Sequence, residues 1–112
     1  MIPVPAQAHT ASMTGDHRAR LMAAGRQAFE RGDFFQAHEH WEEVWREAAG
    51  PERRWLQGLI QVAAALHQDA RGRPGPAARL LARGLEKLAG APDSLDGVDL
   101  AAVRRAAEQG SR

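Results

Sequence analysis

Apolar positions recur every three to four residues along most of the chain, which is the spacing of one face of an α-helix. The alternation typical of strands is missing, Val and Ile are sparse, and glycine and proline interrupt the pattern at regular intervals. The segment "GAPDSLDG" is expected to be a loop. The pattern predicts four main helices and a short last one, over about Asp16–Arg31, Asp33–Gly50, Pro51–Arg71, Pro76–Ala89 and Asp99–Gln109.

The residues at the predicted helix ends support these boundaries. Asp16 and Asp33 are suitable N-caps, and Gly32 can adopt the left-handed conformation that ends a helix. Pro51 suits a first helical turn, because its missing N–H is not needed there.

Short connections place consecutive helices antiparallel to each other. The sequence therefore predicts an all-α fold: an antiparallel up-and-down bundle of four main helices plus a short C-terminal helix. Residues 16–110 are expected to form a single domain after a disordered tail of residues 1–15. The third helix is apolar or small on nearly all sides, with Gly58 and Ala65 allowing close approach, so it is predicted to be central.

The second predicted helix carries polar residues where a bundle would need apolar ones. With about 100° of rotation per residue, His38 falls in the stripe formed by Phe34, Trp41 and Trp45. Glu42 falls at the border of that stripe. The pattern therefore predicts an imidazole and a carboxylate inside the bundle.

The third helix repeats this anomaly, because His67 lies among leucine and alanine positions and Gln57 and Gln61 follow one flank. An antiparallel pair turning near Gly50 brings together residues whose numbers sum to about 100. This docking places Glu42 near Ile60 and Gln61, His38 near Ala63 and His67, and Trp45 near Leu56. It predicts an internal polar cluster of His38, Glu42 and His67, edged by Gln57, Gln61 and Trp45.

Three explanations of this cluster remain open at this point. The residues can satisfy one another in a purely structural hydrogen-bond network. They can hold a divalent metal ion, with His38, Glu42 and His67 as ligands and water completing the shell. They can also form a pocket for a small polar ligand or an acid–base reaction, in which Trp45, Gln57 and Gln61 contact the ligand.

Composition restricts the compartment, the possible partners and the kinds of site, but it does not indicate an activity. The 112 residues contain no cysteine, which excludes disulfides and thiolate metal sites, and we expect a cytoplasmic protein. A net charge of +1 with mixed signs gives no reason to expect a nucleic acid partner. We expect no secretory signal, because the first residues lack a basic and an apolar region, and no apolar run reaches the ~18–20 residues of a membrane span. An alanine-rich bundle can leave an apolar face uncovered, so a homodimer is compatible with the sequence.

Three segments in order, "GDFFQAHEHWEEVWRE", "RRWLQGLIQVAAALHQ" and "PAARLLARGLEKL", resemble the DUF309 family of small bacterial and archaeal helical proteins of unknown function. The family's His-x-x-x-Glu-x-x-Trp or -Tyr pattern falls on His38, Glu42 and Trp45, and the resemblance covers about Phe29–Leu88. It implies an all-helical bundle and metal binding at the histidine and glutamate.

The resemblance leaves the activity open, and two classes of function remain. If the protein is an enzyme, we expect metal-assisted chemistry on a small molecule, with His38 and Glu42 as ligands and His67 as ligand or proton carrier. The alternative is a non-catalytic helical interaction module that binds a protein partner, in which the cluster only fixes helix register.

Overall fold

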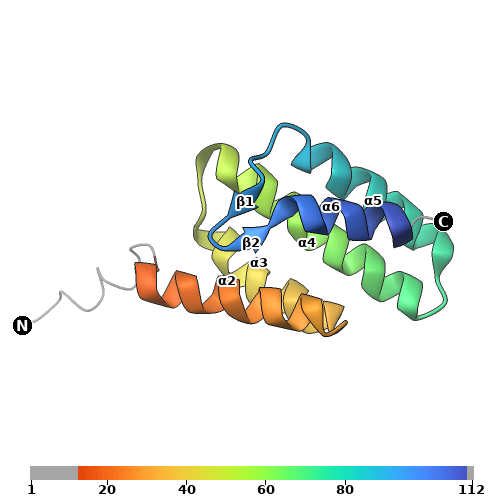
Figure 1. Cartoon of the computed structure of the whole chain (residues 1–112), viewed down its shortest axis with the longest axis horizontal. Coiled ribbons are helices and arrows are strands. Elements are labelled where there is room, and N and C mark those ends of the chain that lie inside the picture. The colour runs from red at the N-terminus through yellow and green to blue at the C-terminus, as the bar shows by residue number, and fades with distance from the viewer. Residues whose placement is uncertain (1–12, 111–112) are drawn as a thin grey trace, which may run out of the picture.

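The computed structural model describes residues 13–110, which form a bundle of five helices and a two-stranded hairpin (Figure 1). The elements are α2 (Gly15–Glu30), α3 (Phe34–Glu47), α4 (Gly50–Ala70), α5 (Pro74–Leu88), β1 (Ser94–Leu95), β2 (Val98–Asp99) and α6 (Leu100–Gly110). Each main helix packs on the next along the chain, and α4 also contacts α6. The all-α up-and-down prediction is therefore confirmed, with α4 at the centre.

The helix ends show which capping predictions were correct. Asp33 caps α3 by accepting from the backbone N–H of Gln36 at 3.2 Å, and Gly32 has a φ of +83°. The cap of α2 is Thr14 rather than Asp16, because the Thr14 hydroxyl oxygen accepts from the N–H of His17 at 3.1 Å. Of the predicted tail, only residues 13–15 lie within the described residues.

Several helix boundaries and one loop differ from the prediction. Helix α3 ends at Glu47 rather than Gly50, and α4 begins at Gly50, ahead of the proline. Helix α5 begins at Pro74 rather than Pro76. The segment expected to be a loop supplies the first strand and the turn of an antiparallel hairpin, in which Leu95 pairs with Val98 just after that segment. Both side chains are buried, so the hairpin pins the connection between α5 and α6 to the core.

One hydrophobic core extends through the described residues, and its largest fully buried side chain is Trp41. The indole Nε1 donates to the backbone oxygen of Met22 at 3.3 Å, so the buried polar atom is satisfied. Helix α4 meets α5 at Gly58 and Gly84, where a Cβ built on either glycine would lie within 3 Å of the other's oxygen. Within residues 13–110, no helix combines the length and apolar character needed to cross a bilayer.

A charged clasp ties α2 to two other parts of the fold. Arg18 donates from Nη2 to Glu52 in α4 and from Nε to Asp96 in the hairpin turn, both at 2.6 Å. Burial acts to lower the pKa of Arg18, but the hydrogen bonds to Glu52 and Asp96 outweigh it and raise the pKa above its ordinary value. The guanidinium therefore stays charged throughout the pH range in which the protein folds.

Arg18→Ala is expected to lower the free energy of unfolding by about 1 kcal/mol, since both ion pairs are partly solvated. The loss should shrink in high salt, which screens such pairs. Urea denaturation at low and high ionic strength measures it, with Arg20→Ala, an exposed arginine on the same helix, as the control. If Arg18→Ala and Arg20→Ala have the same free energy of unfolding, the ion pairs of Arg18 do not stabilise the fold.

Candidate functional site

The polar residues singled out in the sequence lie along the groove between α3 and α4, but they are not buried. Among residues 13–110 no polar or charged residue is fully buried. The side chains of His38 and Glu42 retain 26% and 34% exposure, and His67 is half-buried. The prediction of an internal cluster is therefore wrong, and the site is open to solvent.

The reason lies in how α3 faces the core. Its buried residues are Ala37, Trp41 and Val44, followed by the capping residue Ala48. This stripe is rotated away from His38, which stands about 60° from Trp41 around the helix, while Glu42 stands about 100° away. The two polar residues therefore lie in the groove between α3 and α4, where one side of each remains exposed to solvent.

The structure brings together His38, Glu39 and Glu42, each offering one donor atom, with all three atoms within 4.8 Å of one another. His38 Nδ1 lies 3.4 Å from Glu39 Oε2, is itself buried and makes no hydrogen bond to any residue from 13 to 110. Glu42 accepts a hydrogen bond from Arg46 at 3.2 Å. An imidazole and two carboxylates form a ligand set suited to a divalent cation.

His67 does not join this group. It lines a hollow of about 240 Å³ together with His38, Gln68, Phe35 and Ala64. The Phe35 ring contacts both imidazoles, with centroid distances of 6.4 Å to His38 and 5.5 Å to His67. The predicted proximity of the two histidines across the helices is thus correct, and the Phe35 ring contacts both of them.

A second hollow of about 170 Å³ continues the groove and contains the remaining predicted residues. Glu42, Trp45, Gln57 and Gln61 line it, with Ile60 as the apolar wall. The predicted docking of Glu42 near Ile60 and Gln61 is confirmed. Lys87 from α5 donates to Gln61 Oε1 at 3.1 Å, which brings a positive charge to this end of the groove.

Three side-chain atoms of the described residues are buried without a hydrogen-bond partner, and all three belong to residues that line these two hollows. They are His38 Nδ1, Trp45 Nε1 and Gln68 Oε1. Arg53 covers the Trp45 ring at 3.9 Å and donates to the backbone oxygens of Trp45 and Ala48, so it fixes the indole without satisfying its N–H. Such unsatisfied groups indicate a place where water, an ion or a ligand binds.

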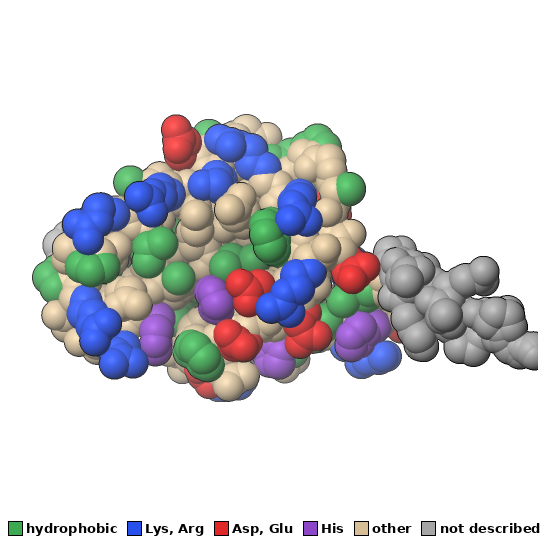
Figure 2. Space-filling model, turned by 180° about the vertical axis from the view of Figure 1, so that it is seen from behind, with side chains coloured by type: hydrophobic (Ala, Val, Ile, Leu, Met, Phe, Trp, Pro, Cys, Tyr) green, Lys and Arg blue, Asp and Glu red, His purple; other side chains and the backbone are tan. Residues whose placement is uncertain are grey.

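Glu39 belongs to this group although it is not among the site residues predicted from the sequence. The residue is exposed, but its long side chain turns toward His38. Neighbouring residues on a helix point about 100° apart, so spacing alone could not bring it into the cluster. Figure 2 shows histidine and acidic side chains close together on this face of the molecule, with arginine and lysine side chains both among them and around them.

Comparisons with known proteins agree with this fold and leave the activity open. The chain is 34% identical over 103 residues to an uncharacterized protein of Aquifex aeolicus, a match that covers 90% of this chain and 31% of that protein. The chain thus spans about a third of that relative's length.

A solved structure also matches, that of a conserved hypothetical protein from Thermus thermophilus. It aligns with a TM-score of 0.68 and 38% identity over 74% of this chain and 86% of that one. Residues 22–80, from within α2 through the groove to α5, match the family described as "Domain of unknown function (DUF309)". The chain therefore belongs to the DUF309 family.

Proposed function

We propose that the groove between α3 and α4 binds a divalent cation, held by His38, Glu39 and Glu42. The observation that carries this proposal is the convergence of their three donor atoms within 4.8 Å. Ligands bonded at about 2 Å to one ion lie roughly 3–4 Å apart, so small side-chain rotations complete the site. His38 Nδ1, which has no hydrogen-bond partner within residues 13–110, supplies a lone pair, and the two carboxylates balance the charge of the ion.

The cation would leave coordination positions open toward the groove, where a small polar ligand binds. Within the described part of the chain Trp45 Nε1 is a donor without an acceptor, and Gln57 and Gln61 line the same hollow. A buried donor left unsatisfied costs about 1–3 kcal/mol, which an acceptor atom on a ligand would recover. His67 lines the neighbouring hollow together with His38 and offers a further imidazole there.

The alternative of a purely structural cluster predicts side chains sealed from solvent. Here His38 and Glu42 are partly exposed, and two hollows adjoin them. These features favour a binding site over a device that only fixes helix register.

Protein purified without chelators or a histidine tag should bind one equivalent of Mn²⁺ or Zn²⁺, measured by elemental analysis and titration calorimetry. His38→Ala and Glu42→Gln should each weaken binding at least about tenfold, in the range found when metal-site groups are lost. Glu39→Gln should weaken it less, because this exposed side chain loses more freedom on binding.

His40→Ala and Glu43→Gln are matched controls, since they change the same residue types on the same helix outside the cluster. Trp45→Phe should leave the stoichiometry of the cation unchanged, because the indole is not a ligand. Binding that is absent in the wild type, or lost equally in the controls, would refute the proposal.

A further inference from the structure

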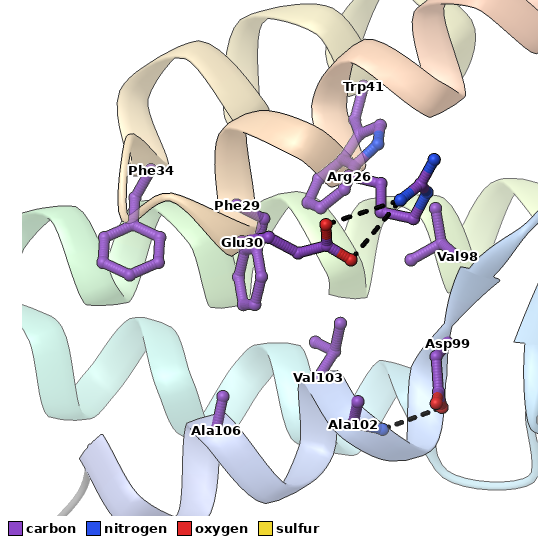
Figure 3. A pocket seen from close by; sticks show the side chains of 10 residues that line it. All are labelled: Arg26, Phe29, Glu30, Phe34, Trp41, Val98, Asp99, Ala102, Val103 and Ala106. Atoms are coloured by element: carbon purple, nitrogen blue, oxygen red, sulfur yellow. Dashed lines mark hydrogen bonds and ion pairs between the residues drawn. The ribbon is translucent and has the colours of Figure 1, made fainter.

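A separate hollow of about 310 Å³ lies between α2, α3 and α6, away from the groove described above. Its wall is mainly apolar, and it shares no residue with the two hollows beside His38. Figure 3 shows Phe29 and Phe34 on one side and the small side chains of α6 on the other. Its volume equals that of about ten liquid water molecules, at the lower end of small-molecule sites.

The hollow exists because α6 does not close against α2. Helix α6 packs on α4 and α5, while α2 meets this end of the chain mainly through β2. Opposite Phe29, α6 presents Ala102 and Ala106, whose methyl groups leave the space between the helices unfilled (Figure 3). A helix with larger residues at these two positions would fill it.

The floor of the hollow is rigid. Trp41 is fully buried and holds its indole by the hydrogen bond to Met22. The Phe29 ring packs on Trp41 at 5.8 Å and on Phe34 at 5.3 Å. A ligand entering here would meet a preformed aromatic surface and would not need to reorganise the core.

The charged residues of the lining are one arginine and two acids. Arg26 Nη1 lies 3.4 Å from both carboxylate oxygens of Glu30, a long and partly exposed pair. Asp99 accepts from the backbone N–H of Ala102 at 2.9 Å and has no ion pair within residues 13–110. The lining therefore has one more negative than positive charge, next to aromatic rings that attract cations.

We infer that this hollow is a second binding site, for a small molecule that joins an aromatic or branched apolar body to an ammonium group. The apolar body fills the space between Phe29, Phe34 and the α6 alanines. The ammonium group lies at the rim, beside the Asp99 carboxylate, which forms no ion pair with any described residue. This inference is independent of the proposed cation site, since the two share no residue.

The test uses three probes with the same ring and different charge: phenethylamine, 2-phenylethanol and phenylacetate. Binding to the full chain is followed by tryptophan fluorescence and calorimetry, and amide chemical shifts locate it. Phenethylamine should bind at least tenfold more tightly than phenylacetate, with 2-phenylethanol between them. The largest shift changes should fall on α2, β2 and α6.

Ala106→Leu fills the hollow and should reduce phenethylamine binding at least tenfold, with the melting temperature unchanged or raised. Asp99→Asn keeps the helix cap but removes the charge, so it should reduce the preference for the amine over the alcohol severalfold. Ala82→Leu, at an exposed position on α5, is the control and should bind as the wild type does.

Equal affinity for the amine and the carboxylate would overturn the ligand class. Shift changes confined to other elements, or unaltered binding by a folded Ala106→Leu variant, would overturn the location. If Ala106→Leu does not fold, the shift changes of the wild type decide the location. No binding of any probe at millimolar concentration would overturn the inference as a whole.

Discussion

Gly58→Val is expected to lower the free energy of unfolding by about 3 kcal/mol or more, at the upper end of overpacking effects. A Cβ at position 58 would lie 2.8 Å from the backbone oxygen of Gly84 and 3.0 Å from Lys87 Cβ and Leu88 Cγ. Backbone cannot rotate away as a side chain can, so α4 and α5 would have to separate. Since such a domain has only about 5–15 kcal/mol in total, the melting temperature should fall by about 10 °C or more.

Gly75→Ala is the matched control for this prediction. Gly75 also lies in a helix, but a Cβ there would meet only the end of the Arg79 side chain, at 3.8 Å. Alanine has the higher helix propensity, so the variant should be as stable as the wild type or slightly more so. If circular dichroism gives Gly58→Val and the control the same melting temperature, the close crossing of α4 and α5 is wrong.

The close crossing at Gly58 is a feature that the sequence could predict. A helix that is small or apolar on every side must be covered on every side, and α4 does contact α3, α5 and α6. What the sequence could not provide was the partner, because several small residues were available. Gly84 is identified as the partner only when the two helices are placed in space.

The hairpin was missed although its turn carried a signal. Asp96 and Gly97 both have positive φ, at 48° and 86°, as a two-residue turn with Asp-Gly requires. Each strand has only two residues, which is too short to show alternation. The buried pair Leu95 and Val98 forms because the hairpin packs on the core, a tertiary effect that local patterns do not contain.

For the groove, the sequence could predict which residues of α3 and α4 face each other. It could not predict how deeply the polar side chains are buried. The antiparallel docking placed Glu42 beside Ile60 and His38 opposite His67, as the structure does. The docking assumed that the three aromatic residues mark the centre of the buried stripe. Alanines at positions 37 and 48 shift that centre, because they let α3 approach the core on the side away from His38.

Trp41→Ala is expected to cost about 3–5 kcal/mol, the range found when buried aromatic residues are truncated. The indole is fully buried, packs on Phe29 and donates to the Met22 carbonyl, so the change leaves a cavity in the core and removes that hydrogen bond. Urea denaturation should show a variant near the limit of folding. Trp55→Ala, at a half-buried position, should cost much less and serves as the control.

The Trp41 ring packs directly against Gly25, so the contact between these two residues can be tested with a double variant. A Cβ at position 25 would lie 2.1 Å from the indole Nε1, so Gly25→Ala should be strongly destabilising while the indole is present. In a Trp41→Leu background the obstructing ring atoms are gone, and alanine favours the helix. The double variant should therefore be more stable than the sum of the single effects implies, by about 1–3 kcal/mol. If the effects of the two substitutions on the free energy of unfolding are strictly additive, position 25 does not need glycine to make room for the indole. The contact between α2 and α3 would then be formed differently.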